Sequence, residues 1–151
     1  AGAVVTAPIR TFRIRPEKHG HLSIRVEIFQ NKADLQAASK RENKAHGLRM
    51  GTPRKLIGQC VGVTDRRRGR KTGLFAVLRF PRQHLTMSTL THEAFHATMR
   101  WAERKRITAV PTGPPSNSYH VATVEERCAE VQGEICRRLV VELMRAKLLP
   151  D

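Results

Sequence analysis

A His-Glu-x-x-His pattern occupies residues 92–96, and its three defined side chains are of the types that hold and use a metal ion. Residues four apart on an α-helix share one face, so His92 and His96 can reach a single ion. Glu93 would then lie roughly 100° around the helix, beside the metal rather than on it. A Zn²⁺ ion makes bound water acidic enough to ionise near neutral pH, and a carboxylate there can take the proton. The spacing predicts a catalytic zinc site with Glu93 as general base.

A plainer interpretation needs no metal. Both histidines could be ordinary helix residues, lining a wet groove or lying at core positions where each nitrogen has a hydrogen-bond partner. The setting favours the metal, because the pattern lies in a helix with a wide apolar surface. Apolar residues there form two stripes, so we expect this helix to be buried on two sides. The first stripe is Leu90, Ala94, Ala97 and Trp101, and the second is Phe95, Met99 and Ala102.

A catalytic zinc site generally takes three protein ligands and leaves one position open. We expect Glu126 to be the third, because it begins a seam of small residues in the first turn of the last predicted helix. That seam, which we expect to pack against Ala94 and Ala97, continues through Ala129, Gly133, Cys136 and Val140. Glu126 could instead form a capping box with Thr123. The alternatives for the third ligand are, in order, Glu125, Glu130 and His120.

Two residues near the end of the crossover at 108–117 could stabilise a transition state. Tyr119 and His120 each carry a group that can donate a hydrogen bond to the oxyanion formed when water attacks a carbonyl. This would be an alternative to metal ligation for His120.

The elements that must position these residues indicate one α+β domain over residues 1–151, with an irregular arm at 1–9. Alternating and apolar runs predict a small, mainly antiparallel sheet of about four strands. Periodicity and caps predict a helix at 33–43 capped by Asn31, the motif helix at 85–104, and a C-terminal helix from 123 or 124 to 147 packed against it. The predicted strands are 9–15, 22–29, 57–63 and 74–80.

The charge is strongly unbalanced, with 28 Lys and Arg against 13 Asp and Glu and a net charge of +15. Such a field attracts polyanions or acidic protein surfaces. The last two strands are joined by a basic hairpin loop at 64–73, which could be ordinary solvated surface or could contact nucleic acid. No aromatic residue accompanies it, so stacking of single-stranded bases has little support. Its cationic residues are Arg66, Arg67, Arg68, Arg70 and Lys71.

Three cysteines without a C-x-x-C spacing indicate neither a disulfide framework nor a zinc ribbon, which suits a reducing compartment. The first residues do not resemble a signal peptide, and no apolar run approaches the roughly 20 residues that span a bilayer. We therefore expect a cytoplasmic chain that does not contact membranes.

Two segments together resemble the minimal zincin metallopeptidases, notably small phage-encoded ones, and more distantly SprT-like and ImmA/IrrE-like proteases. They are His92–Ala97 (HEAFHA) and Glu126–Gly133 (ERCAEVQG), where the family has E-x-x-A-x-x-x-G. The resemblance implies that His92, His96 and Glu126 hold Zn²⁺, that Glu93 is the base, and that residues 74–80 form the sheet edge for an extended substrate. The chain lacks the cysteine pairs of SprT proteins and the third histidine of metzincins.

Two functions follow as hypotheses. The first is a zinc-dependent peptidase that acts on a peptide or protein substrate in the cytoplasm, including that of a phage-infected bacterium. The second is a basic protein of a virion or other assembly, bound to nucleic acid or an acidic protein surface, with a zincin fold and a vestigial or accessory zinc site. Zinc-dependent hydrolysis of a non-peptide bond is a weaker third hypothesis, for which the sequence offers no specific feature.

Overall fold

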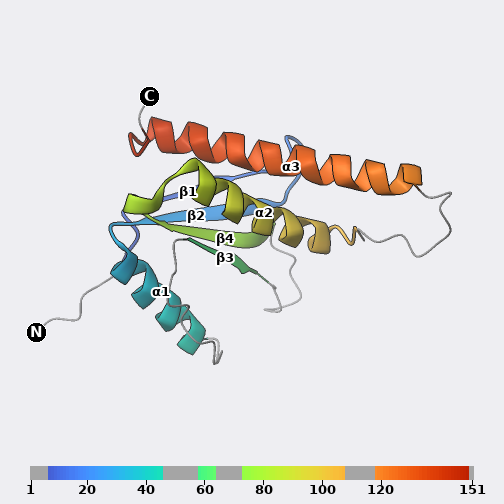
Figure 1. Ribbon diagram of the computed structural model, residues 1–151. Coiled ribbons are helices and arrows are strands. Elements are labelled where there is room, and N and C mark those ends of the chain that lie inside the picture. The colour runs from blue at the N-terminus through green and yellow to red at the C-terminus, as the bar shows by residue number, and fades with distance from the viewer. Residues whose placement is uncertain (1–6, 46–57, 64–72, 108–117, 150–151) are drawn as a thin grey trace, which may run out of the picture.

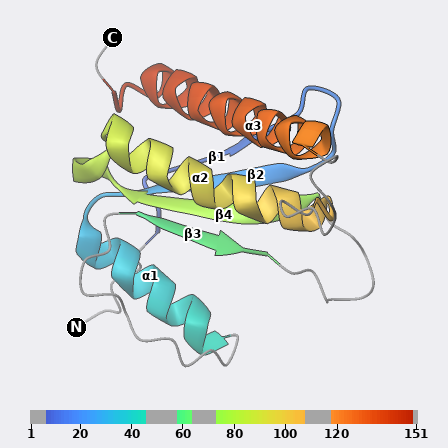
Figure 2. The same ribbon diagram turned by 45° about the vertical axis from the view of Figure 1, so that its right-hand side comes forward.

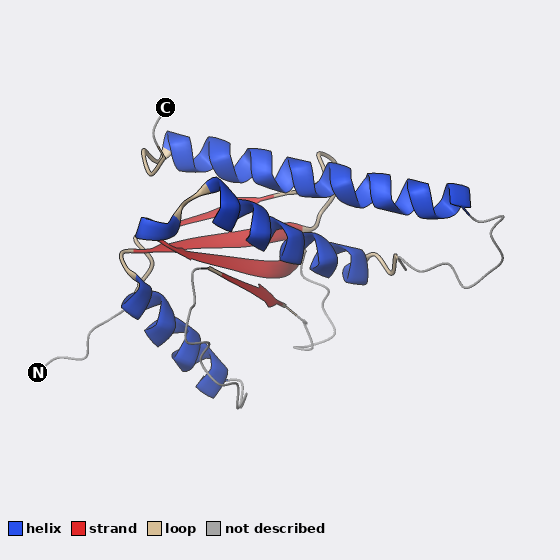
Figure 3. Ribbon diagram, viewed as in Figure 1, coloured by secondary structure: helices blue, strands red, loops and turns tan. Residues whose placement is uncertain are grey.

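The structure is a computed structural model that describes residues 7–45, 58–63, 73–107 and 118–149. These ranges contain a four-stranded sheet and three α-helices, which confirms the predicted α+β class (Figure 3). The strands are β1 (Arg10–Ile14), β2 (Ser23–Phe29), β3 (Gln59–Gly62) and β4 (Leu74–Pro81). The helices are α1 (Lys32–Ala45), α2 (Met87–Arg104) and α3 (Ser118–Arg145), with a 3₁₀ turn, η2 (Arg82–His84), before α2.

The sheet has the strand order β1-β2-β4-β3 and is mixed. The β1–β2 and β3–β4 pairs are antiparallel, whereas β2 and β4 are parallel. The expectation that residues 74–80 form the sheet edge is therefore wrong, because β4 lies between β2 and β3. Its side chains are buried on both faces from Phe75 to Pro81, which suits an interior strand. The edge beside β4 is the shorter and less buried β3.

The main core lies between one face of the sheet and the helices α2 and α3 (Figure 1). Alternation along β2 directs every second side chain to this face, and the partner residues of β4 do the same. Both helices contribute an apolar stripe at helical spacing. The fully buried members include Ile24, Val26 and Ile28 of β2, Leu78 and Phe80 of β4, Leu90, Ala94 and Trp101 of α2, and Ile135 and Leu139 of α3.

Helix α1 packs on the opposite face of the sheet, at the end of β2 that carries Phe29 (Figure 2). Asn31 begins the helix as predicted, since its side-chain oxygen accepts a hydrogen bond of 2.8 Å from the Asp34 N–H. The apolar contact under α1 is small: Phe29 and Leu35 are buried, with Ala38 beside them.

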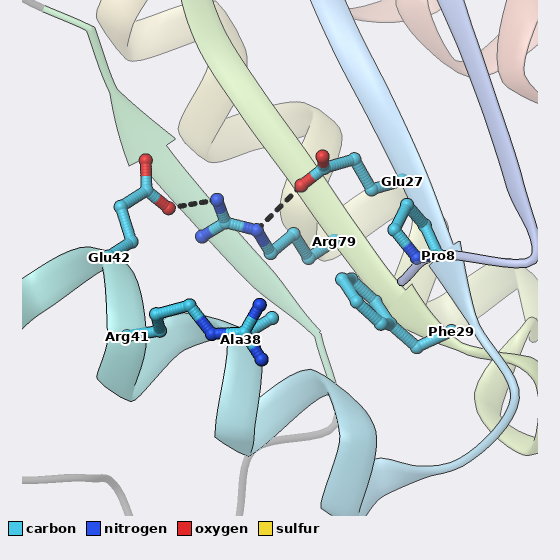
Figure 4. Close-up of a pocket in the computed structure, with 7 residues that line it drawn as sticks. All are labelled: Pro8, Glu27, Phe29, Ala38, Arg41, Glu42 and Arg79. Atoms are coloured by element: carbon cyan, nitrogen blue, oxygen red, sulfur yellow. Dashed lines mark hydrogen bonds and ion pairs between the residues drawn. The ribbon is translucent and has the colours of Figure 1, made fainter. Parts of the chain in front are cut away.

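A buried arginine on β4 links α1 to the sheet (Figure 4). Its side chain is only 5% exposed, and its Nε donates to Glu27 Oε1 of β2 at 2.8 Å. This Arg79 also donates to Glu42 of α1 and, at 3.1 Å, to Gln59 Oε1 of β3. A buried charge is tolerated only when it is paired, so these partners fix α1 against the sheet.

The last helix begins earlier than predicted. We expected Thr123 to cap it, but α3 starts at Ser118, so Thr123 and Glu126 do not form a capping box at its N-terminus. Residues 118–123 contain neither Pro nor Gly, so nothing in that stretch stops the helix. For α2 the prediction is close, because Thr86 caps it by accepting a hydrogen bond from the Thr89 N–H at 3.2 Å.

Most of the predicted basic loop lies outside the described residues, together with Arg66, Arg67, Arg68, Arg70 and Lys71. Most of the predicted N-terminal arm does too. The role of the basic loop in contacting nucleic acid therefore stays a prediction. Of the helices that the structure describes, none combines the length and the apolar character needed to cross a bilayer.

The packing of α3 on the core gives a first prediction. Leu139 is 0% exposed, so Leu139→Ala should leave a cavity and lower the free energy of unfolding by about 2–5 kcal/mol. Met87, which is 59% exposed at the start of α2, is the control: Met87→Ala should change it by less than about 0.5 kcal/mol. Chemical denaturation followed by circular dichroism measures both. Equal losses for the two variants would contradict this packing.

Candidate metal centre

Packing of α2 on the sheet determines which of its side chains face the solvent. Leu90, Ala94, Ala97 and Trp101 are fully buried and form the stripe that faces the sheet. Successive helical residues are about 100° apart, so positions 92 and 96 lie on the opposite side of the helix from this stripe. Both histidines are indeed exposed on α2. They are accessible to an ion from solvent, while the backbone that carries them is held by the core.

The two histidines converge. The Nε2 atoms of His92 and His96 are 3.1 Å apart, and the ring centroids are 4.8 Å apart with planes at 71°. Two ligands at about 2.0–2.1 Å from one tetrahedral Zn²⁺ would have their nitrogens roughly 3.3 Å apart. The same separation also suits a hydrogen bond in which one neutral ring donates to the other. The rings therefore fit the first two positions of a zinc site, and without metal each satisfies the other.

Glu93 lies between the histidines and the sheet. The residue is only 5% exposed, and its Oε1 is 4.0 Å from His92 Nε2. Burial raises the pKa of the Glu93 carboxyl, and the charge of His92 lowers it in part. A carboxyl group whose pKa is moved toward neutrality next to two imidazoles has the properties of a general base or acid.

Strand β3 forms the wall against which Glu93 packs. A Cβ built on Gly58 would lie 3.0 Å from Glu93 Cγ and 3.2 Å from Oε1, so the missing side chain leaves room for the carboxylate. Further along, a Cβ on Gly62 would lie 3.1 Å from Arg100 Cδ. Cys60 lies between these points, and burial, then the Glu93 charge, raise its pKa to about 12. Gly58 and Cys60 were not predicted as part of the site, because their contact with α2 joins segments that no local sequence pattern connects.

The structure does not bring Glu126 to the histidines. Among the residues that it describes, which include Glu126, no group of three His, Cys, Asp or Glu could hold a metal ion. On α3 the buried positions include Val124, Val131 and Ile135. Glu126 is about 200° around the helix from Val124 and is exposed. The alternatives Glu125 and Glu130 are exposed as well.

The flank of α2 that faces α3 is not the flank that carries the histidines. Thr91 hydrogen-bonds the Cys136 thiol of α3, and Arg127 of α3 lies over the Trp101 ring at 5.3 Å. These contacts show that the helices run antiparallel, as Figure 1 also shows. Thr91 and Glu93 are about 200° apart on α2, so α3 and β3 flank opposite sides of it.

The predicted seam of small residues is therefore wrong in part. Cys136 contacts α2, but Gly133 is exposed and a Cβ built on it would meet nothing within 4 Å. Ala129 is exposed as well. The second apolar stripe of α2 is also largely uncovered, because Phe95 is 48% exposed and Met99 36% exposed. Of that stripe only Ala102 is buried.

Tyr119 and His120, the predicted transition-state stabilisers, lie in the first turn of α3 by backbone, but their side chains are outside the described part of the structure. Their proposed role, and that of His120 as a ligand, stays a prediction.

A cavity of about 300 Å³ lies between α1 and the sheet (Figure 4). Its apolar lining includes Phe29 and Ala38, and its acidic residues are Glu27 and Glu42. Both carboxylates are already engaged by Arg79, so the charges of this cavity stabilise the fold. The two converging histidines lie on α2 instead.

The contact between β3 and Glu93 gives a prediction for thiol reactivity. Replacing Glu93 by Gln removes a negative charge that raises the Cys60 pKa. Alkylation of Cys60 by iodoacetamide at pH 8 should therefore speed up, about tenfold for each unit by which its pKa falls. Cys136, whose pKa burial raises without a contribution from Glu93, is the internal control. Peptide mass spectrometry gives both rates, and a parallel change at the two thiols would refute the contact.

No protein-family model matches this chain, and comparison with curated proteins and with solved structures also gives no match. The resemblance to zincins therefore rests on the residues of the chain itself, and its functional content is a proposal.

Proposed function

We propose that this protein is a zinc-dependent hydrolase of the metallopeptidase type, in which His92 and His96 bind Zn²⁺ and Glu93 transfers protons. The observation that carries the proposal is the convergence of two Nε2 atoms to 3.1 Å next to a buried carboxylate. Both histidines are exposed, so the nitrogens of each ring could bond to water instead of pointing at the other ring. A buried carboxylate beside them has an energetic cost that a functional role explains.

The chemistry that Zn²⁺ supplies when bound is the polarisation of a carbonyl and the acidification of water. Glu93 Oε1 is held against Gly58 and faces His92, so it can accept a proton from the attacking water and return it to the leaving amine. Its raised pKa makes the carboxylate a stronger base than that of an exposed glutamate, which favours uptake of the proton.

Strand β3 supports the choice of a peptide substrate. Among the described strands it pairs only with β4, so its other edge has free backbone donors and acceptors. An extended peptide can add to such an edge as a further strand. Because β3 packs beside Glu93, a peptide bound along this edge would run past the histidines. This assigns to β3 the docking role that we had expected of β4.

The metal proposal predicts that the purified protein, prepared without chelator, binds about one Zn²⁺ per chain. His92→Asn and His96→Asn should each remove most of that zinc, because either change leaves one imidazole. His19→Asn, at an exposed histidine before β2, is the matched control and should retain it. Elemental analysis after gel filtration measures the content. Equal zinc in all four proteins would exclude this site.

The same measurement tests the third ligand. Glu126 remains the predicted donor from the resemblance, although it lies apart from the histidines in this structure. If it binds zinc, Glu126→Gln should lower zinc affinity and Glu125→Gln should not. Unchanged affinity in both would show that the third donor is another residue.

The catalytic proposal predicts that Glu93→Gln keeps its zinc but loses cleavage of an unfolded protein substrate by about 10²-fold or more. Glu103→Gln, at an exposed carboxylate near the end of α2, is the control and should stay active. Release of labelled peptides from casein measures the rate. Zinc binding without cleavage in the wild type would favour the alternative hypothesis of a basic structural protein with an accessory zinc site.

A further inference from the structure

Three arginines gather on the face of the sheet that points away from α2 and α3. Arg13 of β1 and Arg25 of β2 are direct partners in the antiparallel register. Their neighbours Ile14 and Ile24 belong to the main core, so alternation directs both arginines to the opposite face. Arg15 lies two residues after Arg13, and the following Pro16 favours an extended backbone there. Arg15 is the first residue after β1, so an extended backbone continues the alternation of the strand and directs Arg15 to the same face as Arg13.

The arrangement of charges on this face is unfavourable by itself. Like charges directly opposite each other in an antiparallel pair destabilise the sheet. Arg25 is 3.5 Å from Glu27 Oε2, but Glu27 also accepts from Arg79 at 2.8 Å. Within the described residues, the Arg25 Nε is buried and has no hydrogen-bond partner. Arg13 and Arg15 are exposed and have no acidic partner in that part of the chain. Glu27 is thus shared by the guanidinium groups of Arg25 and Arg79.

We propose that this surface, defined by Arg13, Arg15 and Arg25, binds the phosphate backbone of nucleic acid. All three residues are arginines, whose planar fork of donors matches phosphate oxygens better than a lysine does. An extended backbone spaces Arg13 and Arg15 roughly 6.6 Å apart, and Arg25 is about 5 Å from Arg13 across the β1–β2 pair. Cations at this density complement a polyanion with closely spaced charges. The net charge of +15 acts in the same direction.

The surface is suited to the backbone rather than the bases. Phe12, the aromatic residue within β1, packs toward the main core, so it offers no ring for stacking on this face. Helix α1 covers the Phe29 end of the same face, whereas Arg13 and Arg25 lie toward the Ser23 end. Binding here should therefore be largely independent of sequence. The surface lies across the sheet from His92 and His96, so this inference does not depend on the proposed hydrolase activity.

The test compares two double variants that lose the same charge. Arg13→Gln with Arg15→Gln removes two cations of the proposed surface, and Arg137→Gln with Arg145→Gln removes two from the far side of α3, where each pairs with a neighbouring glutamate. Fluorescence anisotropy with a labelled 20-base-pair DNA duplex gives the affinity from 50 to 200 mM salt. The surface variant should bind on the order of tenfold more weakly, and its salt slope should fall by about 1.8, as expected for two lost phosphate contacts.

The control variant should bind within about twofold of the wild type and keep its slope. Equal weakening of both variants would show that total charge alone acts, and no weakening of either would show that the surface is not used; both results overturn the proposal. So would binding of the wild type to phosphatidylserine vesicles but not to DNA. Circular dichroism of the variants establishes that the substitutions leave the fold intact.

Discussion

The packing of one apolar stripe of α2 onto the sheet is the constraint on which the candidate site depends. Leu90, Ala94, Ala97 and Trp101 are all fully buried. Once this stripe is fixed, helical geometry leaves no freedom for the remaining positions. His92 and His96 must face outward, and Glu93 must lie along the side of the helix. Core packing thus sets the side of the helix on which both imidazoles lie, and the side-chain conformations of the two residues then bring the rings together.

The second constraint comes from β3. Because this strand passes beside α2 and is directly preceded by Gly58, the Glu93 carboxylate is held in a buried position without a side chain opposing it at position 58. The same strand is a free edge of the described sheet. Glu93, which is proposed to transfer protons, therefore lies beside the strand edge that is proposed to bind a peptide. Burial raises the Glu93 pKa, and Glu93 in turn contributes to the raised pKa of Cys60. The contact between β3 and α2 therefore influences the pKa values of both Glu93 and Cys60.

The sequence predicted what depends on local pattern. The α+β class, the cap at Asn31 and the helix carrying His92 were predictable, because periodicity and capping are properties of neighbouring residues. Prediction from the sequence failed where the outcome depends on the order of strands in the sheet or on how a helix is rotated about its axis. The sequence predicts both β3 and β4 as strands. Only the pairing of β4 with β2 shows that β4 is the interior strand of the sheet. Likewise, the placement of Glu126 required the rotation of α3 about its axis, which the Thr91–Cys136 contact sets and no spacing reveals.

The two faces of the sheet divide the proposed functions. One face supports α2, with the histidines on its outer side, and the other exposes arginines that have few acidic partners. A hydrolase that is held on a polyanion by one face could act with the other.

Zinc K-edge X-ray absorption of the zinc-loaded protein shows whether both imidazoles bind the same ion. We expect scattering from two imidazoles with nitrogen at about 2.0–2.1 Å from the zinc, reduced to one imidazole in His96→Asn. A spectrum without imidazole, or one unchanged in that variant, would contradict it.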